Sequence, residues 1–148
     1  MTISKLTDDL KISSMKEMMP PCDLIKELPM SEKAIETVLN CRSEIIKILN
    51  GDDKRLMLIV GPCSIHDTMA ASEYAQKLLK LKEKVKKNIL VIMRVYFEKP
   101  RTVVGWKGLI NDPDLDNSFN INKGIKIARK LLIDLAEMGI PAGHEYLD

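Results

Sequence analysis

Two short segments of the sequence contain side chains whose types and spacing allow chemistry. The first is GPCSIHD, residues 61–67, in which Cys63 offers a thiol and His66 and Asp67 add further coordinating atoms. A thiol in this position can serve as a nucleophile, a redox group or a metal ligand. The spacing alone favours a plainer interpretation, a half-buried cysteine beside an Asp67 that caps a helix. The segment is not a phosphate-binding P-loop, because the GxxxxGK[ST] pattern is absent.

The second segment is MRVYFEKPRT, residues 93–102, which gathers basic side chains. Arg94 lies among apolar neighbours, where an unpaired charge costs on the order of several kcal/mol, so we expect it to meet an anion or a carboxylate. Lys99, Arg101 and the hydroxyl of Thr102 follow closely. Together these anion-seeking groups favour a phosphorylated or carboxylated ligand. The alternative is an internal Arg–Glu pair with solvated loop residues, and for Arg94 alone both interpretations stay open.

Both segments follow predicted strands. Residues 55–62 and 89–96 are short, nearly continuous apolar runs, which is typical of strands covered on both faces. A third strand is expected to begin within IPAGHEYLD, residues 140–148. Strands of this kind, separated by helices, predict an α/β fold with parallel strands.

Three amphipathic helices are predicted between or before these strands. The first begins after Ser31 and ends at Gly51, the second begins at Asp67 or Thr68, and the third ends at Gly139. Residues 1–30 are expected to form a polar, Met-rich arm. The predicted apolar faces comprise Ile35, Val38, Leu39, Ile45, Ile46 and Leu49 in the first helix, Ala71, Tyr74, Ala75, Leu78 and Val85 in the second, and Ile121, Ile125, Ala128, Leu132 and Leu135 in the third.

The connection from residue 97 to about residue 120 shows no clear periodicity and is longer than the usual strand-to-helix connection. It leaves the carboxyl end of a strand, where α/β folds place their ligands. We therefore expect functional residues in it. Its polar and aromatic members include Lys99, Arg101, Trp106, Lys107, Asn111, Asp112 and Asp116.

The overall composition excludes several classes of protein. With 148 residues, 45% hydrophobic and 30% charged, the chain is typical of a globular domain. A net charge of +2 argues against nucleic acid and membrane partners. Cys22, Cys41 and Cys63 lack the spacing of a disulfide framework or a closed zinc site. Without a leader or a membrane-spanning apolar stretch, a cytoplasmic location is expected.

Five segments in order resemble one family: GPCSIHD, MRVYFEKPRT, GWKGLINDP, DNSF and INKGIKIARKLL. They are similar to the class I, aromatic-amino-acid-regulated 3-deoxy-D-arabino-heptulosonate 7-phosphate (DAHP) synthases. The resemblance implies condensation of phosphoenolpyruvate with erythrose 4-phosphate, releasing phosphate, the first step of the shikimate pathway to aromatic amino acids. It also implies a (β/α)8 TIM barrel with an N-terminal helical extension.

On this resemblance the chain is an N-terminal fragment of such a synthase, with about three of the eight barrel strands. Residues 1–52 would form the N-terminal arm and helix, an oligomerisation and regulatory extension. Residues 53–148 would form the first βα units of an incomplete barrel. The whole protein would be a homo-oligomer, and the fragment alone is expected to be inactive.

The resemblance also implies roles for individual residues. Arg94 resembles an arginine that binds phosphoenolpyruvate, and Lys99 resembles the lysine between the two substrates, our choice of proton donor. Arg101 and Thr102 match the segment that holds the phosphate of erythrose 4-phosphate.

Further expectations concern the metal and one carboxylate. Cys63 resembles the cysteine ligand of a divalent metal ion, for which Mn, Fe, Co and Zn all remain open, with the other ligands absent from this chain. Glu145 resembles a glutamate near the phosphoenolpyruvate site, although GHEYLD departs from the family's GEFLD pattern at this point.

An aromatic amino acid effector is the last expectation from the resemblance. Asp8, Asp9 and Ile12 lie in an arm that resembles part of the family's effector pocket, and a solvated tail anchored by one isoleucine is the equal alternative.

Three other functions compete with DAHP synthesis. They are a non-catalytic remnant that pairs with an intact synthase, the related 3-deoxy-octulosonate 8-phosphate synthase, and a thiol-redox protein. The KPRT segment and the GWKGLINDP loop disfavour the octulosonate enzyme, and the lack of a nearby resolving cysteine disfavours the redox function.

Overall fold

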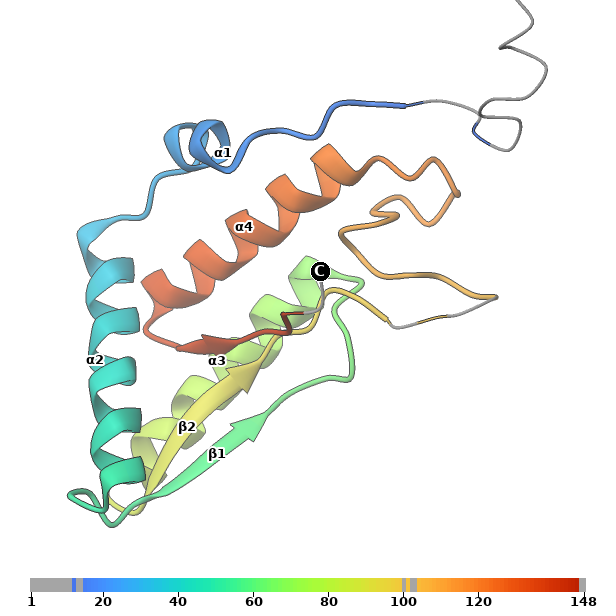
Figure 1. Cartoon of the computed structure of the whole chain (residues 1–148). Coiled ribbons are helices and arrows are strands. Elements are labelled where there is room, and N and C mark those ends of the chain that lie inside the picture. The colour runs from blue at the N-terminus through green and yellow to red at the C-terminus, as the bar shows by residue number, and fades with distance from the viewer. Residues whose placement is uncertain (1–11, 13–14, 100, 102–103, 147–148) are drawn as a thin grey trace, which may run out of the picture.

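The computed structural model describes residues 12, 15–99, 101 and 104–146. In chain order the elements are α1 (Pro21–Glu27), α2 (Glu32–Asn50), β1 (Leu56–Val60), α3 (Thr68–Val85), β2 (Ile89–Arg94), α4 (Ile121–Met138) and β3 (Ala142–Gly143) (Figure 1). The strands lie side by side in the order β1-β2-β3 and pair in parallel. The predicted α/β class and the parallel arrangement of the strands are confirmed.

The predicted signals lie at both ends of α2, at the beginning of α3 and at the end of α4. The Ser31 hydroxyl accepts the N–H of Ala34 at 3.2 Å, and the helix ends at Gly51, whose φ is +81°. The Asp67 carboxylate accepts two backbone N–H groups in the first turn of α3. Gly139 ends α4 with a φ of +88°. A side-chain oxygen at the N-cap and a glycine in the left-handed region satisfy the free backbone groups of helix ends, so local sequence suffices here.

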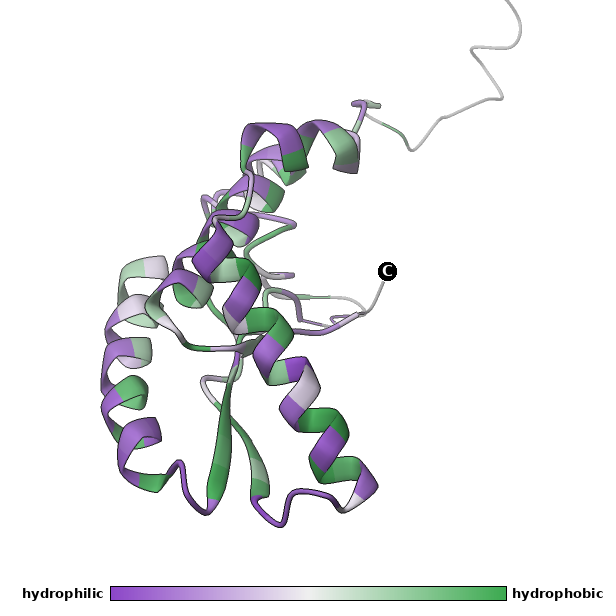
Figure 2. Cartoon of the chain, turned by 90° about the vertical axis from the view of Figure 1, so that its left-hand side faces the viewer, coloured by the Kyte–Doolittle hydropathy of each residue, from purple (hydrophilic) through white to green (hydrophobic). Residues whose placement is uncertain are grey.

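Strand β2 is the centre of the molecule, with helices on both faces (Figure 2). Val91 and Met93 are fully buried against α3 and α4. Leu90 and Ile92 point to the other face, where they contact Cys41 and its neighbours on α2. This alternation follows from the pleat of a strand and explains the continuous apolar run.

Strand β1 differs from expectation. Leu56 and Ile59 are 65% and 54% exposed, so the prediction that this strand is covered on both faces is wrong for β1. In the described part of the chain β1 pairs with β2 alone, which makes it an edge strand. Apolar side chains on such an edge stay uncovered until another segment packs there.

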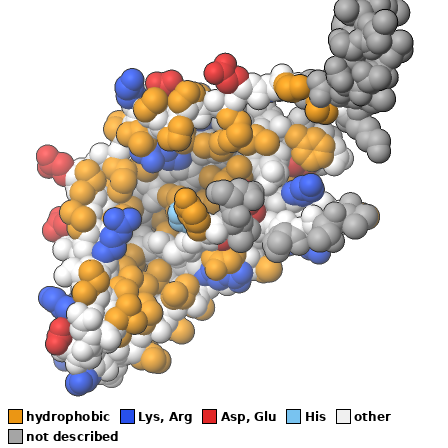
Figure 3. All heavy atoms as spheres, viewed as in Figure 1, with side chains coloured by type: hydrophobic (Ala, Val, Ile, Leu, Met, Phe, Trp, Pro, Cys, Tyr) orange, Lys and Arg blue, Asp and Glu red, His pale blue; other side chains and the backbone are white. Residues whose placement is uncertain are grey.

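The predicted apolar face of α2 is also largely exposed. Ala34 and Cys41 are the residues of this helix that are buried, whereas the stripe formed by Ile35, Leu39, Ile46 and Leu49 faces outward. The face that packs on β2 is rotated from the one the spacing suggested. Hydrophobic side chains are accordingly widespread on the face of the molecule drawn in Figure 3.

Helix α1 was not predicted, because the expected arm of residues 1–30 showed no periodicity. It is seven residues long, buries none of them and begins at a proline, which is favoured in the first turn. Long-range contacts hold the segment against α4: Lys126 pairs with Glu27 at 2.7 Å, and Arg129 donates to the carbonyl of Leu28 at 2.8 Å. No helix among the described residues is long and apolar enough to cross a membrane.

Arg55, just before β1, joins three elements at the amino ends of the strands. Its guanidinium donates to Asp53 at 2.7 Å and to Glu44 of α2 at 2.6 Å. It also donates to the carbonyl of Lys86 at the end of α3 at 3.3 Å. The hydrogen bonds that Asp53 accepts from the side chain and the backbone N–H of Arg55 hold the pKa of its carboxyl below the ordinary value.

Replacement of Asp53 tests this network. Because the folded state lowers the pKa of Asp53, its carboxylate stabilises the fold above its unfolded pKa of about 4, and the stabilisation is lost as pH falls through the lower folded value. Asp53→Asn should therefore lower the melting temperature at pH 7 and have little effect at pH 2. Asp52→Asn, at the exposed neighbouring position, is the control. An equal loss at both pH values for Asp53→Asn would contradict the ionic role.

Candidate active site

The sheet register brings three sequence segments to one edge. Val60 at the end of β1 pairs with Met93 of β2, and Arg94 pairs with Gly143 of β3. Because parallel strands end on the same side of a sheet, the chain after each strand leaves from this edge. The segments that follow hold Cys63, Lys99 and Glu145.

The Cys63 segment is tied to the backbone that follows Arg94. A Cβ atom on Gly61 would lie 2.3 Å from the carbonyl oxygen of Arg94, so only glycine allows this approach. Four residues later, the N–H of Ile65 donates to the carbonyl of Tyr96 at 2.7 Å. Cys63 lies between these two contacts and is exposed. Asp67 acts as a helix cap, as the plainer interpretation predicted.

Arg94 stacks on an aromatic ring. Its guanidinium carbon lies 3.9 Å from the centroid of the Tyr96 ring, a cation–π contact. Among the described residues no salt bridge joins Arg94 to a carboxylate, so the internal Arg–Glu pair does not form there. Stacking fixes the plane of the guanidinium and leaves its N–H edge for an anion. Sequence reasoning missed the role of Tyr96.

Lys99 lies beside an isolated antiparallel bridge between Glu98 and Gly108, and we call the paired segments 97–99 and 107–109 the hairpin. Its N–H donates to the carbonyl of Lys107 at 2.9 Å, and the N–H of Leu109 donates to Phe97 at 2.7 Å. Gly108 has a φ of +117° and allows the two segments to approach each other. A Cβ at this position would lie 2.1 Å from the carbonyl oxygen of Phe97. The backbone around Lys99 is therefore held by residues 107–109, the returning segment of the hairpin.

The remainder of this connection is packed around Asp112. This residue is 3% exposed, and its carboxylate accepts the N–H of Asn117 at 3.2 Å. Its carbonyl accepts the indole N–H of Trp106 at 2.7 Å. Gly124 of α4 lies against the same segment, because a Cβ would be 2.1 Å from the carbonyl oxygen of Ile110. Side chains and close backbone contacts thus hold residues 106–117 of the predicted aperiodic connection in place.

Glu145 connects the end of β3 to the end of β2. Its Oε1 accepts the backbone N–H groups of Phe97 and Glu98, each at 2.5 Å. The other oxygen, Oε2, is buried and has no hydrogen-bond partner among the described residues. The sequence suggested a site role for Glu145 through family resemblance, and nothing local in the sequence predicted these two hydrogen bonds.

The other predicted site residues are less completely placed. Arg101 is exposed beyond Lys99. Thr102, Asp8 and Asp9 lie outside the described residues, and Ile12 is 50% exposed. Within the described ranges no group of three or more His, Cys, Asp or Glu side chains could hold a metal ion. Cys63 alone is too little, because a protein metal site generally uses three or more ligands.

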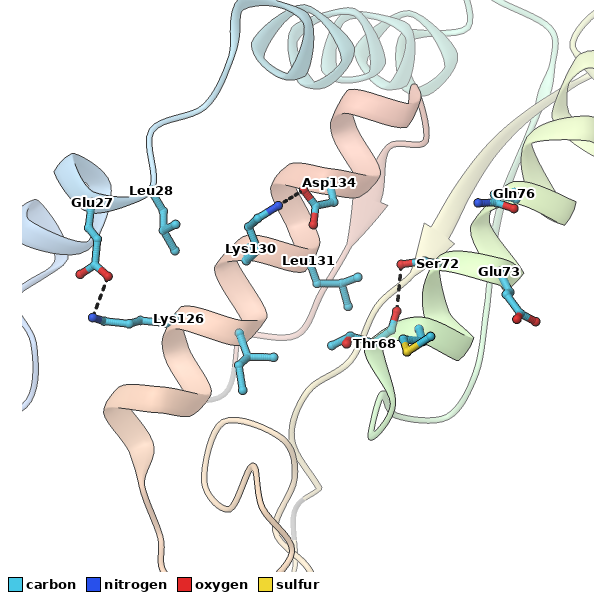
Figure 4. A pocket seen from close by; sticks show the side chains of 12 residues that line it. Glu27, Leu28, Thr68, Ser72, Glu73, Gln76, Lys126, Lys130, Leu131 and Asp134 are labelled. Carbon is cyan, nitrogen blue, oxygen red and sulfur yellow. Dashed lines mark hydrogen bonds and ion pairs between the residues drawn. The ribbon is translucent and has the colours of Figure 1, made fainter.

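A separate pocket lies on the outer surface between α3 and α4 (Figure 4). It has a volume of about 650 Å³, and Ser72 and Lys130 are among its lining residues. Lys130 pairs with Asp134 on the same helix. None of the predicted site residues lines this pocket, so the candidate chemistry lies at the edge of the sheet and not in this hollow.

This geometry defines a class: a parallel α/β protein with an anion-seeking site at the carboxyl ends of its strands. Residues 27–148 match the model of the DAHP synthetase I family. The chain belongs to this family. The resemblance found from the sequence motifs is therefore confirmed.

Individual proteins of this family are also similar to the chain in sequence. The Phe-sensitive phospho-2-dehydro-3-deoxyheptonate aldolase of Escherichia coli K12 is 57% identical over 141 residues, which cover 95% of this chain and 40% of the relative. A Trp-sensitive relative from Buchnera aphidicola (subsp. Schizaphis graminum) is 47% identical over 144 residues, covering 97% of this chain and 41% of the relative. The chain thus spans about 40% of the length of these relatives.

A solved structure gives the same result for the fold. The phospho-2-dehydro-3-deoxyheptonate aldolase of Francisella tularensis SCHU S4 superposes with a TM-score of 0.89 and 55% identity, covering 93% of this chain and 40% of that one. The expectation that the chain has the fold of the first part of a DAHP synthase is confirmed.

The close backbone contact at Gly108 can be tested by substitution, with Gly105 as a matched control. Gly108→Ala should destabilise the fold by about 1–3 kcal/mol more than Gly105→Ala, because overpacking adds to the strain. Both glycines have a positive φ, +117° and +111°, but the atom nearest to a Cβ at Gly105 is 3.7 Å away. Urea unfolding of the two variants measures the difference. Equal stabilities would show that the hairpin gives way around the added methyl group.

Proposed function

We propose that this chain is part of a DAHP synthase that condenses phosphoenolpyruvate with erythrose 4-phosphate. One observation supports this most directly: the in-register pairing of β1 and β2 sets the Cys63 segment against the backbone of Arg94, next to the hairpin that holds Lys99. Family membership supplies the chemical context, since the relatives are named phospho-2-dehydro-3-deoxyheptonate aldolases.

The proposed reaction joins two phosphorylated molecules. Carbon C3 of phosphoenolpyruvate attacks the aldehyde carbon of erythrose 4-phosphate, and the aldehyde oxygen takes a proton. Water then adds at C2 of the former enol, and the C–O bond to the phosphoryl group breaks to release inorganic phosphate. Several negative charges must converge for the carbon atoms to meet, so cationic side chains are required.

The basic residues of this chain take distinct roles in that scheme. Arg94, held flat on Tyr96, binds an anionic group of phosphoenolpyruvate through its N–H edge. Lys99 donates the proton to the developing alkoxide. Arg101 and Thr102 bind the phosphate of erythrose 4-phosphate, as the family's KPRT segment implies.

A divalent metal is part of the proposal only as far as the residues fit it. The exposed thiol of Cys63 would supply one ligand to a Mn, Fe, Co or Zn ion. When bound, such an ion supplies Lewis acidity. No ligand cluster forms among the described residues, so the other ligands would have to come from elsewhere.

Regulation, assembly and location belong to the proposal as well. The Phe-sensitive and Trp-sensitive names of the relatives support an aromatic amino acid effector, for which Ile12 and the two aspartates before it are the candidate residues. The exposed stripe on α2 supports a homo-oligomer of the whole protein.

Three free cysteines suit a reducing compartment such as the cytoplasm.

The same exposed stripe favours a second candidate function. A non-catalytic chain could use Ile35, Leu39 and Ile46 to bind an intact synthase. The two functions differ in one measurement, because only the first requires condensation by a polypeptide that contains this sequence.

Replacement of Lys99 tests the catalytic role. In the full-length enzyme that contains this chain, Lys99→Met should lower kcat by about 100-fold or more, the range expected when a general acid is lost, and leave the metal content unchanged. Lys87→Met, at the exposed amino end of β2, is the matched control and should retain normal turnover. Near-normal turnover of Lys99→Met would contradict the assignment.

The 148-residue chain by itself gives the complementary test. It should show no phosphate release that depends on both substrates, because its described residues hold too few metal ligands and it spans 40% of its relatives. Substrate-dependent release from the isolated chain would contradict this expectation. Activity of an intact synthase that changes when the chain is added would instead support the interaction function.

A further inference from the structure

Glu145 makes contacts that differ from those of a substrate ligand. Its Oε1 accepts two successive backbone N–H groups, those of Phe97 and Glu98, at 2.5 Å each, across 48 and 47 residues of sequence. These are the two amides that immediately precede Lys99. One oxygen of the carboxylate is therefore occupied by the backbone of the neighbouring strand's extension.

These hydrogen bonds continue the sheet beyond the point where β3 ends. Two backbone hydrogen bonds join the two segments. Pro141, just before β3, accepts the N–H of Met93 at 2.8 Å, and Gly143 of β3 accepts the N–H of Val95, just after β2, at 2.9 Å. After Gly143 the ladder ends, and in the segment beyond β2 Glu145 accepts the N–H groups of Phe97 and Glu98. Because an N–H group withdrawn from water needs an acceptor, the Glu145 carboxylate takes the place of a further β3 residue.

The Glu145 contacts also differ in kind from those within the hairpin. The bonds from Lys99 to Lys107 and from Leu109 to Phe97 join the hairpin to itself. They would persist if the hairpin swung as one body about the end of β2. The bonds to Glu145 join its base to β3, and so they define where Lys99 lies relative to the sheet.

We propose that Glu145 is a positioning residue: it fixes Lys99 at the site by accepting the N–H groups of Phe97 and Glu98, and it acts through geometry and not through its charge on a substrate. Two anionic substrates would repel a free carboxylate, whereas one bonded to two N–H groups has its charge partly compensated. The inference rests on the proposed function only in assigning Lys99 its reaction.

Two substitutions separate geometry from charge. Glu145→Gln keeps a carbonyl oxygen that can accept both N–H groups but removes the charge, whereas Glu145→Ala removes the acceptor. Glu137→Ala, at an exposed position of α4, is the control. All are made in the full-length enzyme that contains this chain.

The first readout is amide hydrogen exchange in peptides that cover residues 97–99, which does not depend on activity. Glu145→Ala should raise the exchange rate there by about 10- to 100-fold, and Glu145→Gln should change it by less than about 3-fold.

The second readout is kinetic. Glu145→Ala should lower kcat by about 10-fold or more with a smaller change in KM for phosphoenolpyruvate, and Glu145→Gln should restore most of kcat.

Two results would overturn the proposal. Unchanged exchange at residues 97–99 in Glu145→Ala would show that the carboxylate does not hold this segment. Equal loss of kcat in Glu145→Gln and Glu145→Ala would assign the effect to charge. If the wild-type enzyme itself failed to condense the substrates, the proposed function would fall, while the exchange measurement would still decide whether Glu145 positions the segment.

Discussion

The structure depends above all on the parallel pairing of β2 with both of its neighbours. Val91 and Met93 are fully buried on one face of β2, and Leu90 and Ile92 face α2 on the other, so this strand cannot slip by one residue without turning both sets of side chains around. The register then dictates which residues leave the sheet together. It is this constraint, and no local property of any motif, that brings segments from three strands to one edge.

Beyond the sheet, backbone polar groups must find other partners, and this requirement shapes the candidate site. The carbonyl of Tyr96 is satisfied by Ile65, the N–H groups of Phe97 and Glu98 by a carboxylate, and Lys99 by the returning chain of the hairpin. Such close pairing leaves no room for side chains at several positions. The glycines at 61, 108 and 124 are steric requirements of this edge, each with a backbone carbonyl where a Cβ would lie.

Sequence reasoning succeeded where the determining contacts are local and failed where they are distant. Ser31, Gly51 and Asp67 act within one helical turn, so helix limits could be predicted from them. The orientation of α2 depends on β2, more than 30 residues away. Its predicted face was wrong for four of six residues, whereas Val38 and Ile45 are partly buried. The Glu145 hydrogen bonds span almost 50 residues, and no periodicity signals them. Motif resemblance suggested Arg94, Lys99 and Glu145 as site residues, and their roles stay predictions. The domain boundary at residues 52 and 53 stays a prediction.

Two features that look unrelated share one physical origin. Strand β1 has a neighbour on one side among the described residues and exposes Leu56 and Ile59. Just beyond the carboxyl end of the same strand lies the exposed thiol of Cys63, and no cluster of metal ligands forms among the described residues. A further parallel strand on the open side of β1 would cover the apolar edge, and by the same geometry would deliver its own carboxyl-end residues beside Cys63. If Cys63 is a metal ligand, as proposed, stability and metal binding are coupled through β1, because a strand that covered this edge would also place its residues beside Cys63.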